Sequence, residues 1–178
     1  MKLLTCSLIL FILASSYRID FGSQDDQIRW RVVNDGVMGG LSTGSVTYYE
    51  TSMAFSGRVS LENNGGFASI RSSYRERDLS TYTQVKIRYR SKDYDFGLSL
   101  NKDRRFWIPN YKQNLSQTNW EWKTVQFDLL DFKEYYIGRP TGNKISKKEL
   151  AQIIQIGFIS NEKRAGDFNI EIDYIEFI

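Results

Sequence analysis

The most informative part of this chain is its glycine-rich segment, Asn34-Asp35-Gly36-Val37-Met38-Gly39-Gly40-Leu41-Ser42-Thr43-Gly44. Its four glycines predict a backbone with tight turns, because glycine accepts positive φ angles without a steric penalty. A phosphate-binding loop is excluded, since the spacing does not fit G-x-G-x-x-G, the P-loop lysine is missing and no helix follows. We interpret the stretch as a structural loop that packs Met38 and Leu41 against the rest of the domain.

Alternating apolar and polar residues on both sides of this loop predict half-buried strands. The segments that show this alternation most clearly are 28–33, 53–61, 85–90 and 168–177. A high aromatic content of 15% also favours strands. No long helical pattern separates them, so crossover connections between parallel strands are not expected.

Local turn signals suggest how these strands connect. Asn64-Gly65 between two apolar segments predicts a type I′ hairpin turn. Residues 94–100 are expected to form a hairpin with residues 85–90, and 104–109 to form a short strand. One short helix is expected after Ser146, because Ser146 and Glu149 have the spacing of a capping box. The predicted fold is an all-β, antiparallel β-sandwich of the jelly-roll type.

The N-terminus has the pattern of a secretory signal, with a basic start, a short apolar run and small residues at 14–16. We expect residues 1–16 to be a signal peptide and residues 17–178 to form a single domain. An uncleaved anchor helix is the alternative. The protein would then be exported to the periplasm or the extracellular space, without a stable membrane span once the signal is removed.

Composition excludes several kinds of chemistry. The chain contains no histidine, and Cys6, its one cysteine, lies inside the apolar run at the N-terminus. This removes the usual general base, the commonest transition-metal ligand and an internal disulfide, so no metal and no cofactor is expected. A net charge of +3 is too small to indicate a nucleic-acid partner.

Acidic residues do not identify a catalytic pair. Asp25 and Asp26, for example, are adjacent in a polar segment, but glycoside hydrolysis requires two carboxyls held at a set separation across a cleft. A calcium site built from Asn34 or Asp35 is possible, although the spacing is not that of an EF-hand. We assign no catalytic residues.

Aromatic and arginine side chains are the candidates for a ligand or partner surface. Trp and Tyr rings offer sugars a flat apolar face with a polar edge, although a given Trp is more often part of a core. Arginines that alternate with apolar residues along a strand lie on its polar face. Such arginines are more often solvated charges than binding contacts. The candidate residues are Arg71, Arg90, Arg105, Trp107, Tyr111 and Trp120.

Several runs of sequence together resemble the complex I intermediate-associated protein domain. The most specific are Asp35-Gly36-Val37-Met38-Gly39-Gly40 and Asn64-Gly65-Gly66-Phe67, and the similarity continues to Ile172-Asp173-Tyr174-Ile175. The resemblance implies a galactose-binding-like jelly roll without catalytic residues. Its mitochondrial member assists assembly of NADH:ubiquinone oxidoreductase by binding partner proteins, whereas related sandwich folds often bind carbohydrate.

The chain departs from the family pattern at Ser91-Lys92-Asp93, at Asp128 and in its N-terminal signal. An exported protein cannot easily take part in the matrix-side steps of complex I assembly, so family membership and the assembly role are separate questions. Two functions remain open for a non-enzymatic binding protein. One is protein–protein interaction during complex assembly, and the other is carbohydrate binding by an exported module. A hydrolase is the least favoured class.

Overall fold

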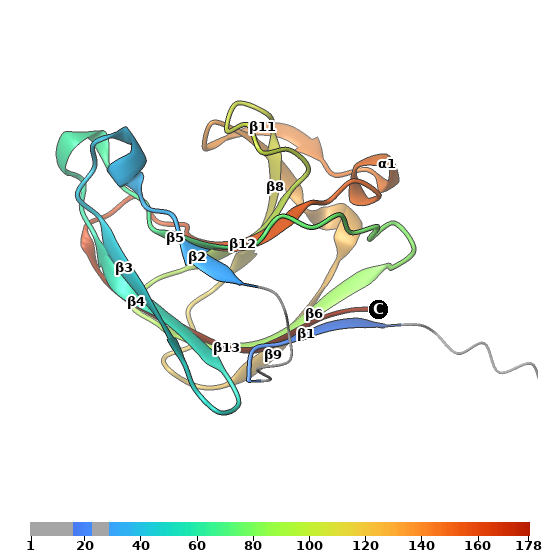
Figure 1. The fold of residues 1–178 in the computed structure, drawn as a ribbon, viewed down its shortest axis with the longest axis horizontal. Coiled ribbons are helices and arrows are strands. Elements are labelled where there is room, and N and C mark those ends of the chain that lie inside the picture. Colours follow the sequence, from blue (N-terminus) through green and yellow to red (C-terminus); the bar gives the residue numbers. More distant parts are fainter. Residues whose placement is uncertain (1–15, 23–28) are drawn as a thin grey trace, which may run out of the picture.

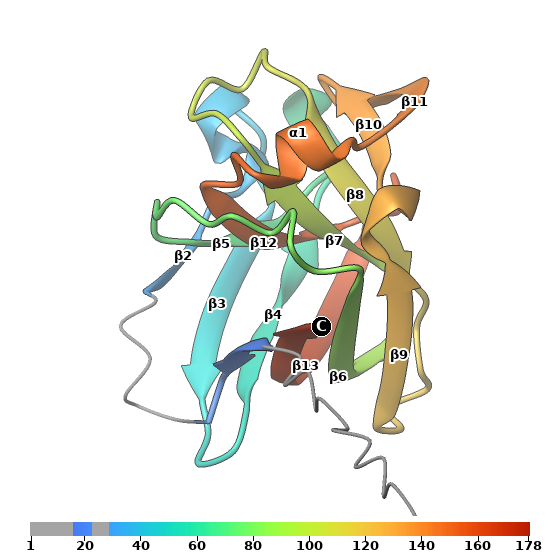
Figure 2. The same cartoon turned by 90° about the vertical axis from the view of Figure 1, so that its right-hand side faces the viewer.

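The computed structural model describes residues 16–22 and 29–178, which form two antiparallel sheets packed face to face (Figures 1 and 2). The strands are β1 (Tyr17–Asp20), β2 (Trp30–Val32), β3 (Thr43–Tyr48), β4 (Met53–Val59), β5 (Ser69–Ser72), β6 (Gln84–Lys92), β7 (Phe96–Asn101), β8 (Asn110–Leu115), β9 (Lys123–Asp128), β10 (Lys133–Tyr136), β11 (Arg139–Lys144), β12 (Gln155–Ser160) and β13 (Gly166–Phe177).

The six-stranded sheet has the order β3-β4-β13-β6-β9, and β1 also pairs with β13. The seven-stranded sheet has the order β11-β10-β8-β7-β12-β5-β2. Short helical turns are confined to the connections: η1 (Asp35–Met38), η2 (Glu62–Asn64), η3 (Leu129–Asp131) and α1 (Lys147–Leu150). This arrangement confirms the predicted all-β, antiparallel sandwich.

The core lies between the sheets and follows the alternation seen in the sequence. Val85, Ile87 and Tyr89 of β6 point inward and are buried. On β13 the register with β6 shifts between Ile172 and Tyr174, a bulge that changes which residues of this strand face the core. Burying a large apolar side chain contributes roughly 1.5–3 kcal/mol, so this continuous core supplies most of the stability.

The glycine-rich loop is organised by the buried carboxylate of Asp35. Its Oδ1 accepts a hydrogen bond from the Ser42 backbone N–H at 3.0 Å. Its Oδ2 accepts hydrogen bonds from the Ser42 hydroxyl at 2.5 Å and from the backbone N–H groups of Gly66 and Phe67 at 2.7 and 3.2 Å. One side chain therefore joins residues 35–42 to residues 66–67, the two most specific runs of the sequence.

Glycine is required in this loop for two different reasons. Gly39 has a φ of +89°, the left-handed conformation expected of it. Gly40 has no such angle, but a Cβ there would lie 2.4 Å from Cγ of Asp35. The first glycine permits the turn, and the second leaves room for the carboxylate.

The expectation that Met38 and Leu41 pack against the sandwich is wrong. Their exposed fractions are 71% and 53%. The loop forms a projection at one end of the sandwich, and it is anchored by the hydrogen bonds of Asp35 instead of by apolar contact.

The two predicted hairpins are also wrong. β4 and β5 lie in different sheets, so the connection through Asn64 crosses from one layer to the other. Asn63 and Asn64 do have positive φ angles of 53° and 60°, but they lie in η2 and not in a two-residue hairpin. β6 and β7 are likewise in opposite sheets. Local turn chemistry marked the reversals but did not determine which sheet the next strand joins.

Two smaller expectations have opposite outcomes. Residues 104–109 form a loop between β7 and β8, not a strand. The short helix is confirmed as α1, with the capping box between Ser146 and Glu149 in place.

The predicted signal segment, residues 1–16, lies outside the described residues except for Ser16. Among the residues that the structure describes, no helix is long and apolar enough to cross a membrane.

Candidate functional site

The outer face of the seven-stranded sheet carries a row of cationic side chains. Arg31 of β2 pairs with Arg71 of β5, and Arg71 pairs with Gly157 of β12. The row continues from Gly157 to Ser99 of β7, and from Ser99 to Lys112 of β8. Side chains at paired positions project from the same face, so two arginines and a lysine flank a floor made of glycine and serine. We call Arg31, Arg71, Gly157, Ser99 and Lys112 the transverse row.

This floor is closely packed: Gly157 and Ser99 are both buried, and there is no room for larger side chains. A Cβ at Gly157 would lie 2.8 Å from the Ile70 carbonyl oxygen and 2.9 Å from Oγ of Ser99. One strand further, Lys112 Cδ would lie 3.4 Å from a Cβ built at Gly97. The aliphatic part of Lys112 therefore lies down along the sheet, beside the floor.

Tyrosine rings hold the cations in place. The Lys112 ammonium lies 3.7 Å from the centre of the Tyr135 ring, which β10 supplies. On the other side of the floor, the Tyr74 ring has Arg31 at 5.2 Å and Arg104 at 4.7 Å from its centre. Such cation–π contacts position a positive charge without neutralising it.

Burial lowers the pKa of both flanking cations. The pKa of Lys112 falls to about 8 because its ammonium is partly removed from water. The pKa of Arg71 is lowered first by burial and further by the neighbouring charge of Arg31, with an opposing effect from Tyr74. Among the described residues, neither Arg71 nor Lys112 forms an ion pair.

The charge balance differs sharply between the two outer faces. On the six-stranded sheet, cations are paired with acids: Arg90 Nη2 lies 2.6 Å from Glu171 Oε2, and Lys86 Nζ lies 3.9 Å from Glu176 Oε2. The described strands of the seven-stranded sheet contain one acidic residue, Glu134. It follows Lys133 directly in β10, so its side chain points to the opposite face of the sheet from the outward side chain of Lys133. The cations of the seven-stranded sheet are Arg31, Arg71, Lys112, Lys133, Arg139 and Lys144, of which Lys144 is paired with Asp131 at 2.7 Å.

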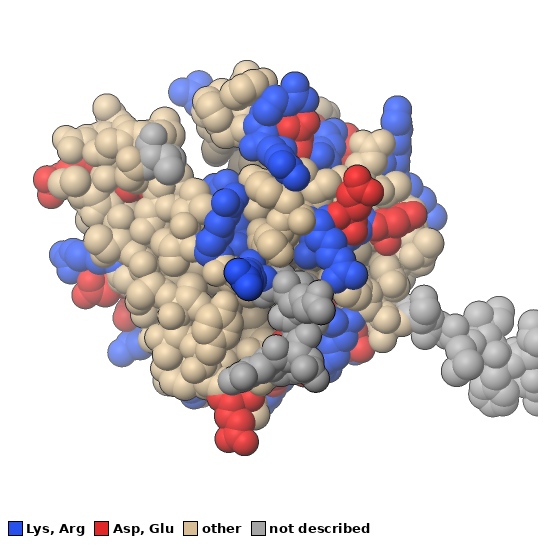
Figure 3. Space-filling view, viewed as in Figure 1, with Lys and Arg blue, Asp and Glu red and all other residues tan. Residues whose placement is uncertain are grey.

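This cationic face is hollowed. In Figure 1 the seven-stranded sheet curves, so that β8 and β11 rise at one side of β12 and β5, and the turns of η1 and η2 rise at the other. Figure 3 shows a hollow between these two projections, with blue side chains along its side and base. We call this hollow the trough.

The structure places one of the sequence-predicted residues on the outer face of the seven-stranded sheet, two in the β7–β8 loop and three elsewhere. Arg71 is in the transverse row. Trp107 lies in the β7–β8 loop, the loop whose Arg104 reaches Tyr74, and is 49% exposed, edge-to-face with Phe106 at 5.1 Å between ring centres. Arg105 lies in the same loop but is engaged by Asp103 at 2.7 Å.

Tyr111 does not reach the surface, contrary to expectation. Successive side chains of β8 point to opposite faces of the sheet. Because Lys112 points outward, Tyr111 points into the core and has no exposed area. Its hydroxyl accepts a hydrogen bond from Lys102 Nζ at 3.1 Å and interacts with Glu149 of α1. Burial and Glu149 together raise the pKa of Tyr111, which has a structural role.

Arg90 and Trp120 lie together on the outer face of the other sheet. The Arg90 guanidinium is 4.5 Å from the centre of the Trp120 ring and 4.8 Å from that of Trp122. It also donates two hydrogen bonds to Glu171 Oε2, at 2.9 and 2.6 Å. Both the charge of Arg90 and a face of each ring are therefore already engaged.

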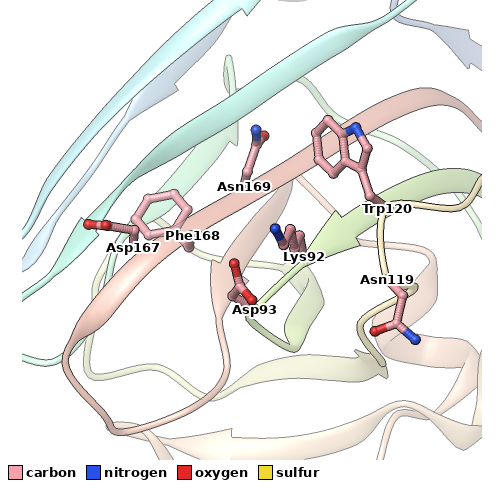
Figure 4. Close-up of a pocket in the computed structure, with 7 residues that line it drawn as sticks. All are labelled: Lys92, Asp93, Asn119, Trp120, Asp167, Phe168 and Asn169. Atoms are coloured by element: carbon pink, nitrogen blue, oxygen red, sulfur yellow. The ribbon is translucent and has the colours of Figure 1, made fainter.

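A pocket of about 520 Å³ lies beside Trp120 (Figure 4). Trp120 is held there in a left-handed conformation with a φ of 67°, and its backbone N–H donates to the Ser91 carbonyl at 3.0 Å. The pocket combines one aromatic ring with amides and charges of both signs. Its lining residues are Lys92, Asp93, Asn119, Trp120, Asp167, Phe168 and Asn169.

No metal site stands out in the part of the chain that the structure describes. No group of three or more His, Cys, Asp or Glu side chains there is placed to hold an ion. Asp35, considered as a calcium ligand, uses its oxygens to accept hydrogen bonds from Ser42, Gly66 and Phe67.

Sequence reasoning missed Lys112, Tyr74 and Tyr135. The alternation of residues 110–115 carried a signal for the first, since a buried Tyr111 requires an outward Lys112. Tyr135 and Tyr74 depend on which strands become neighbours, and nothing in the local sequence specifies this.

The fold is shared with solved structures of low sequence identity. One is a family 11 carbohydrate-binding module from Clostridium thermocellum in complex with a β-1,3-1,4-mixed-linked tetrasaccharide, with 15% identity, a TM-score of 0.62, and 92% of this chain and 95% of that chain covered. The family 11 module of the cellulase Lic26A-Cel5E from the same organism has 16% identity and a TM-score of 0.63, with 92% and 94% covered.

An agarase, AgWH50C, has 8% identity and a TM-score of 0.59 over 92% of this chain, which spans 24% of that enzyme. No curated protein sequence matches the chain. The model of the family described as complex I intermediate-associated protein 30 (CIA30) matches residues 19–172. Because this match spans most of the chain, and includes the Asp35 loop and the run at residues 64–67 that it binds, the chain belongs to the CIA30 family.

Proposed function

We propose that this protein is a non-enzymatic binding protein that holds a carbohydrate chain in the trough of the seven-stranded sheet. The observation that carries this proposal is the cationic and aromatic lining of the trough, where Lys112 and Arg31 lie against the rings of Tyr135 and Tyr74. Aromatic side chains beside polar groups suit sugar rings. The fold shared with carbohydrate-binding modules supports this choice.

The absence of catalysis is part of the proposal. Glycoside hydrolysis needs two carboxyl groups on either side of the scissile bond. On the described strands beneath the trough the one acidic residue is Glu134, and its carboxylate accepts hydrogen bonds from Thr141 at 2.8 Å and Asn143 at 3.0 Å. The described strands beneath the trough can therefore bind and orient a chain, but they do not supply a pair of carboxyls. We further propose that residues 1–16 direct the protein to the periplasm or the exterior, where it would meet such chains.

A protein partner is the second candidate, and exposed apolar residues favour it. Phe106 and Trp107 project from the β7–β8 loop with exposed fractions of 72% and 49%, and Met38 and Leu41 project from the glycine-rich loop. Apolar groups at loop tips are common anchors for other proteins. Membership in the CIA30 family fits a role in assembly, by analogy with what the family's name describes.

A glycan array, combined with affinity capture from the native envelope fraction, separates the two candidates. We expect the full chain, expressed with its own N-terminus, to bind a defined class of glycan, and Tyr135→Ala to weaken that binding about tenfold through loss of a ring contact. Tyr49→Ala is the matched control, because Tyr49 is an exposed ring after β3, in the other sheet. If no glycan binds and Trp107→Ala abolishes capture of an envelope complex, the protein-partner function replaces the first.

A further inference from the structure

The transverse row has a property that a neutral sugar chain would not require. Its cations are fixed in position but are not neutralised by the protein. Lys112 is held by Tyr135, and Arg31 is held by Tyr74. On the other outer face, carboxylates neutralise cations, as in the pairing of Arg90 with Glu171. Positive charges that a fold fixes without counter-ions remain available to an outside anion.

The spacing of the row suits a chain with repeated charges and not a single small anion. Arg71 and Lys112 are separated by Gly157 and Ser99, hence by three strand spacings, or about 14 Å between backbones. No single carboxylate or sulfate spans that distance. A chain that lies across the strands would meet Arg31 and Arg71 on one side of the floor and Lys112 on the other, with Lys133 at the next position.

The chemistry of the side chains indicates the kind of anion. Arg71 and Arg31 are paired neighbours, and guanidinium groups present a planar set of donors that matches carboxylate or sulfate oxygens. Partial burial makes each cation costly to leave unpaired, and a bound anion would relieve that cost. The tyrosine rings beside these cations favour an acidic sugar chain over an acidic peptide.

We propose that the trough selects anionic glycans, chains whose sugars carry carboxylate or sulfate groups, through Arg71 and Lys112. This inference rests on the proposed function of the trough and names the class of carbohydrate. The aromatic rings orient the cations, and the cations discriminate acidic chains from neutral ones of similar shape.

Binding of four probes to the full chain tests the inference: polygalacturonate, dextran sulfate, neutral mixed-linkage β-glucan and poly-glutamate, each at about 50 and 200 mM NaCl. We expect at least one acidic polysaccharide to bind, with affinity that falls at the higher salt concentration, and β-glucan to bind at least tenfold more weakly. A preference for polygalacturonate or for dextran sulfate distinguishes carboxylate from sulfate as the group bound.

Variants then locate the binding. Arg71→Gln and Lys112→Gln should each weaken binding of the acidic glycan about tenfold, the loss of one charge-assisted contact. Arg71→Lys, which keeps the charge but removes the planar set of donors, should have an intermediate effect. Lys86→Gln is the control, since it removes the same charge from the opposite face and should change binding less than twofold. Thermal unfolding of each variant verifies that it folds.

The outcomes separate failure of the inference from failure of the proposed function. Binding of β-glucan that is as tight as that of the acidic polysaccharides would overturn the anionic preference and keep a glycan-binding trough. Equal effects of Lys86→Gln and Lys112→Gln would also overturn it, because attraction would then depend on net charge alone. Poly-glutamate that binds as tightly as polygalacturonate would overturn the carbohydrate class. If none of the three polysaccharides binds, the proposed function itself fails.

Discussion

At the residue scale, Asp35 explains why two separate runs of this sequence identify the family. Burial alone would raise the pKa of Asp35, but hydrogen bonds from Ser42, Gly66 and Phe67 outweigh burial and hold the pKa below its usual value. The carboxylate is therefore charged at neutral pH, and every partner around it is a donor. Glycines are needed beside it because a side chain at Gly40 would occupy its space.

Replacing Asp35 with asparagine should destabilise the fold by about 3 kcal/mol, because an amide NH₂ would face hydrogen-bond donors in a buried site. Chemical denaturation at neutral pH measures the change. Asp78→Asn is a matched control, since Asp78 also accepts hydrogen bonds from a backbone N–H and a hydroxyl, both of Ser80, but is exposed. Asp78→Asn should change the free energy of unfolding by no more than about 0.5 kcal/mol in either direction. Equal effects of the two substitutions would contradict the organising role of Asp35.

At the scale of elements, α1 shows how a four-residue helix stabilises a much larger region. Its Glu149 completes the capping box with Ser146, and also accepts a hydrogen bond from Lys102 at 3.0 Å and interacts with the buried Tyr111. The element therefore connects the β7–β8 loop, which borders the trough, to the core strand β8.

This cluster predicts a dependence of stability on pH. Burial alone would raise the pKa of Glu149, but hydrogen bonds from Tyr111, Ser146 and Lys102 lower it to about 2, against 4.5 for the free side chain. A lowered pKa in the folded state stabilises the protein above pH 4.5, and this contribution is lost as the pH falls toward 2.

The free energy of unfolding should therefore fall over this range more steeply in the native protein than in Glu149→Gln. Denaturation midpoints between pH 6 and 2 measure the two slopes. Glu121→Gln, at an exposed position, is the control and should leave the slope unchanged. Parallel curves for the native protein and Glu149→Gln would contradict the role assigned to this carboxylate.

The elements also show what the sequence was able to predict. Alternation identified most strands and, for 85–90, the face that each side chain takes. The capping box identified α1. Alternation and the capping box are both reliable here because each depends on residues only a few positions apart in the sequence. Asn64 carried a real turn signal, but whether β5 joins the sheet of β4 or the opposite sheet depends on contacts across the whole sandwich. The trough depends on the same long-range choice, so Arg71 was foreseen while Tyr74 and Tyr135 were not.

At the scale of the whole molecule, the outer faces of the two sheets differ in charge, although both sheets contribute to the core between them. One face pairs Arg88 with Asp173 and Arg90 with Glu171, and the other leaves Arg71 and Lys112 unpaired among the described residues. A net charge of +3 conceals this difference. A total charge therefore says little about a partner when the fold sorts its charges by face.

The proposed export makes a further prediction about the N-terminus of the protein. If residues 1–16 are removed, the mature protein begins at Tyr17, the first residue of β1, and keeps all the strands that the structure describes. It also loses Cys6 and with it all thiol reactivity. Intact mass and thiol labelling of the protein recovered from the envelope or medium measure both. A full-length, thiol-reactive protein in the cytoplasm would contradict export.

The pairing of β1 with β13 has a consequence for how this domain can be used. Tyr17 lies opposite Phe177, and their rings stack with centres 5.9 Å apart. The two ends of the described domain therefore leave from adjacent, paired strands (Figure 2). A domain with this geometry can be spliced into a surface loop of a host protein through both ends at once, without stretching either junction.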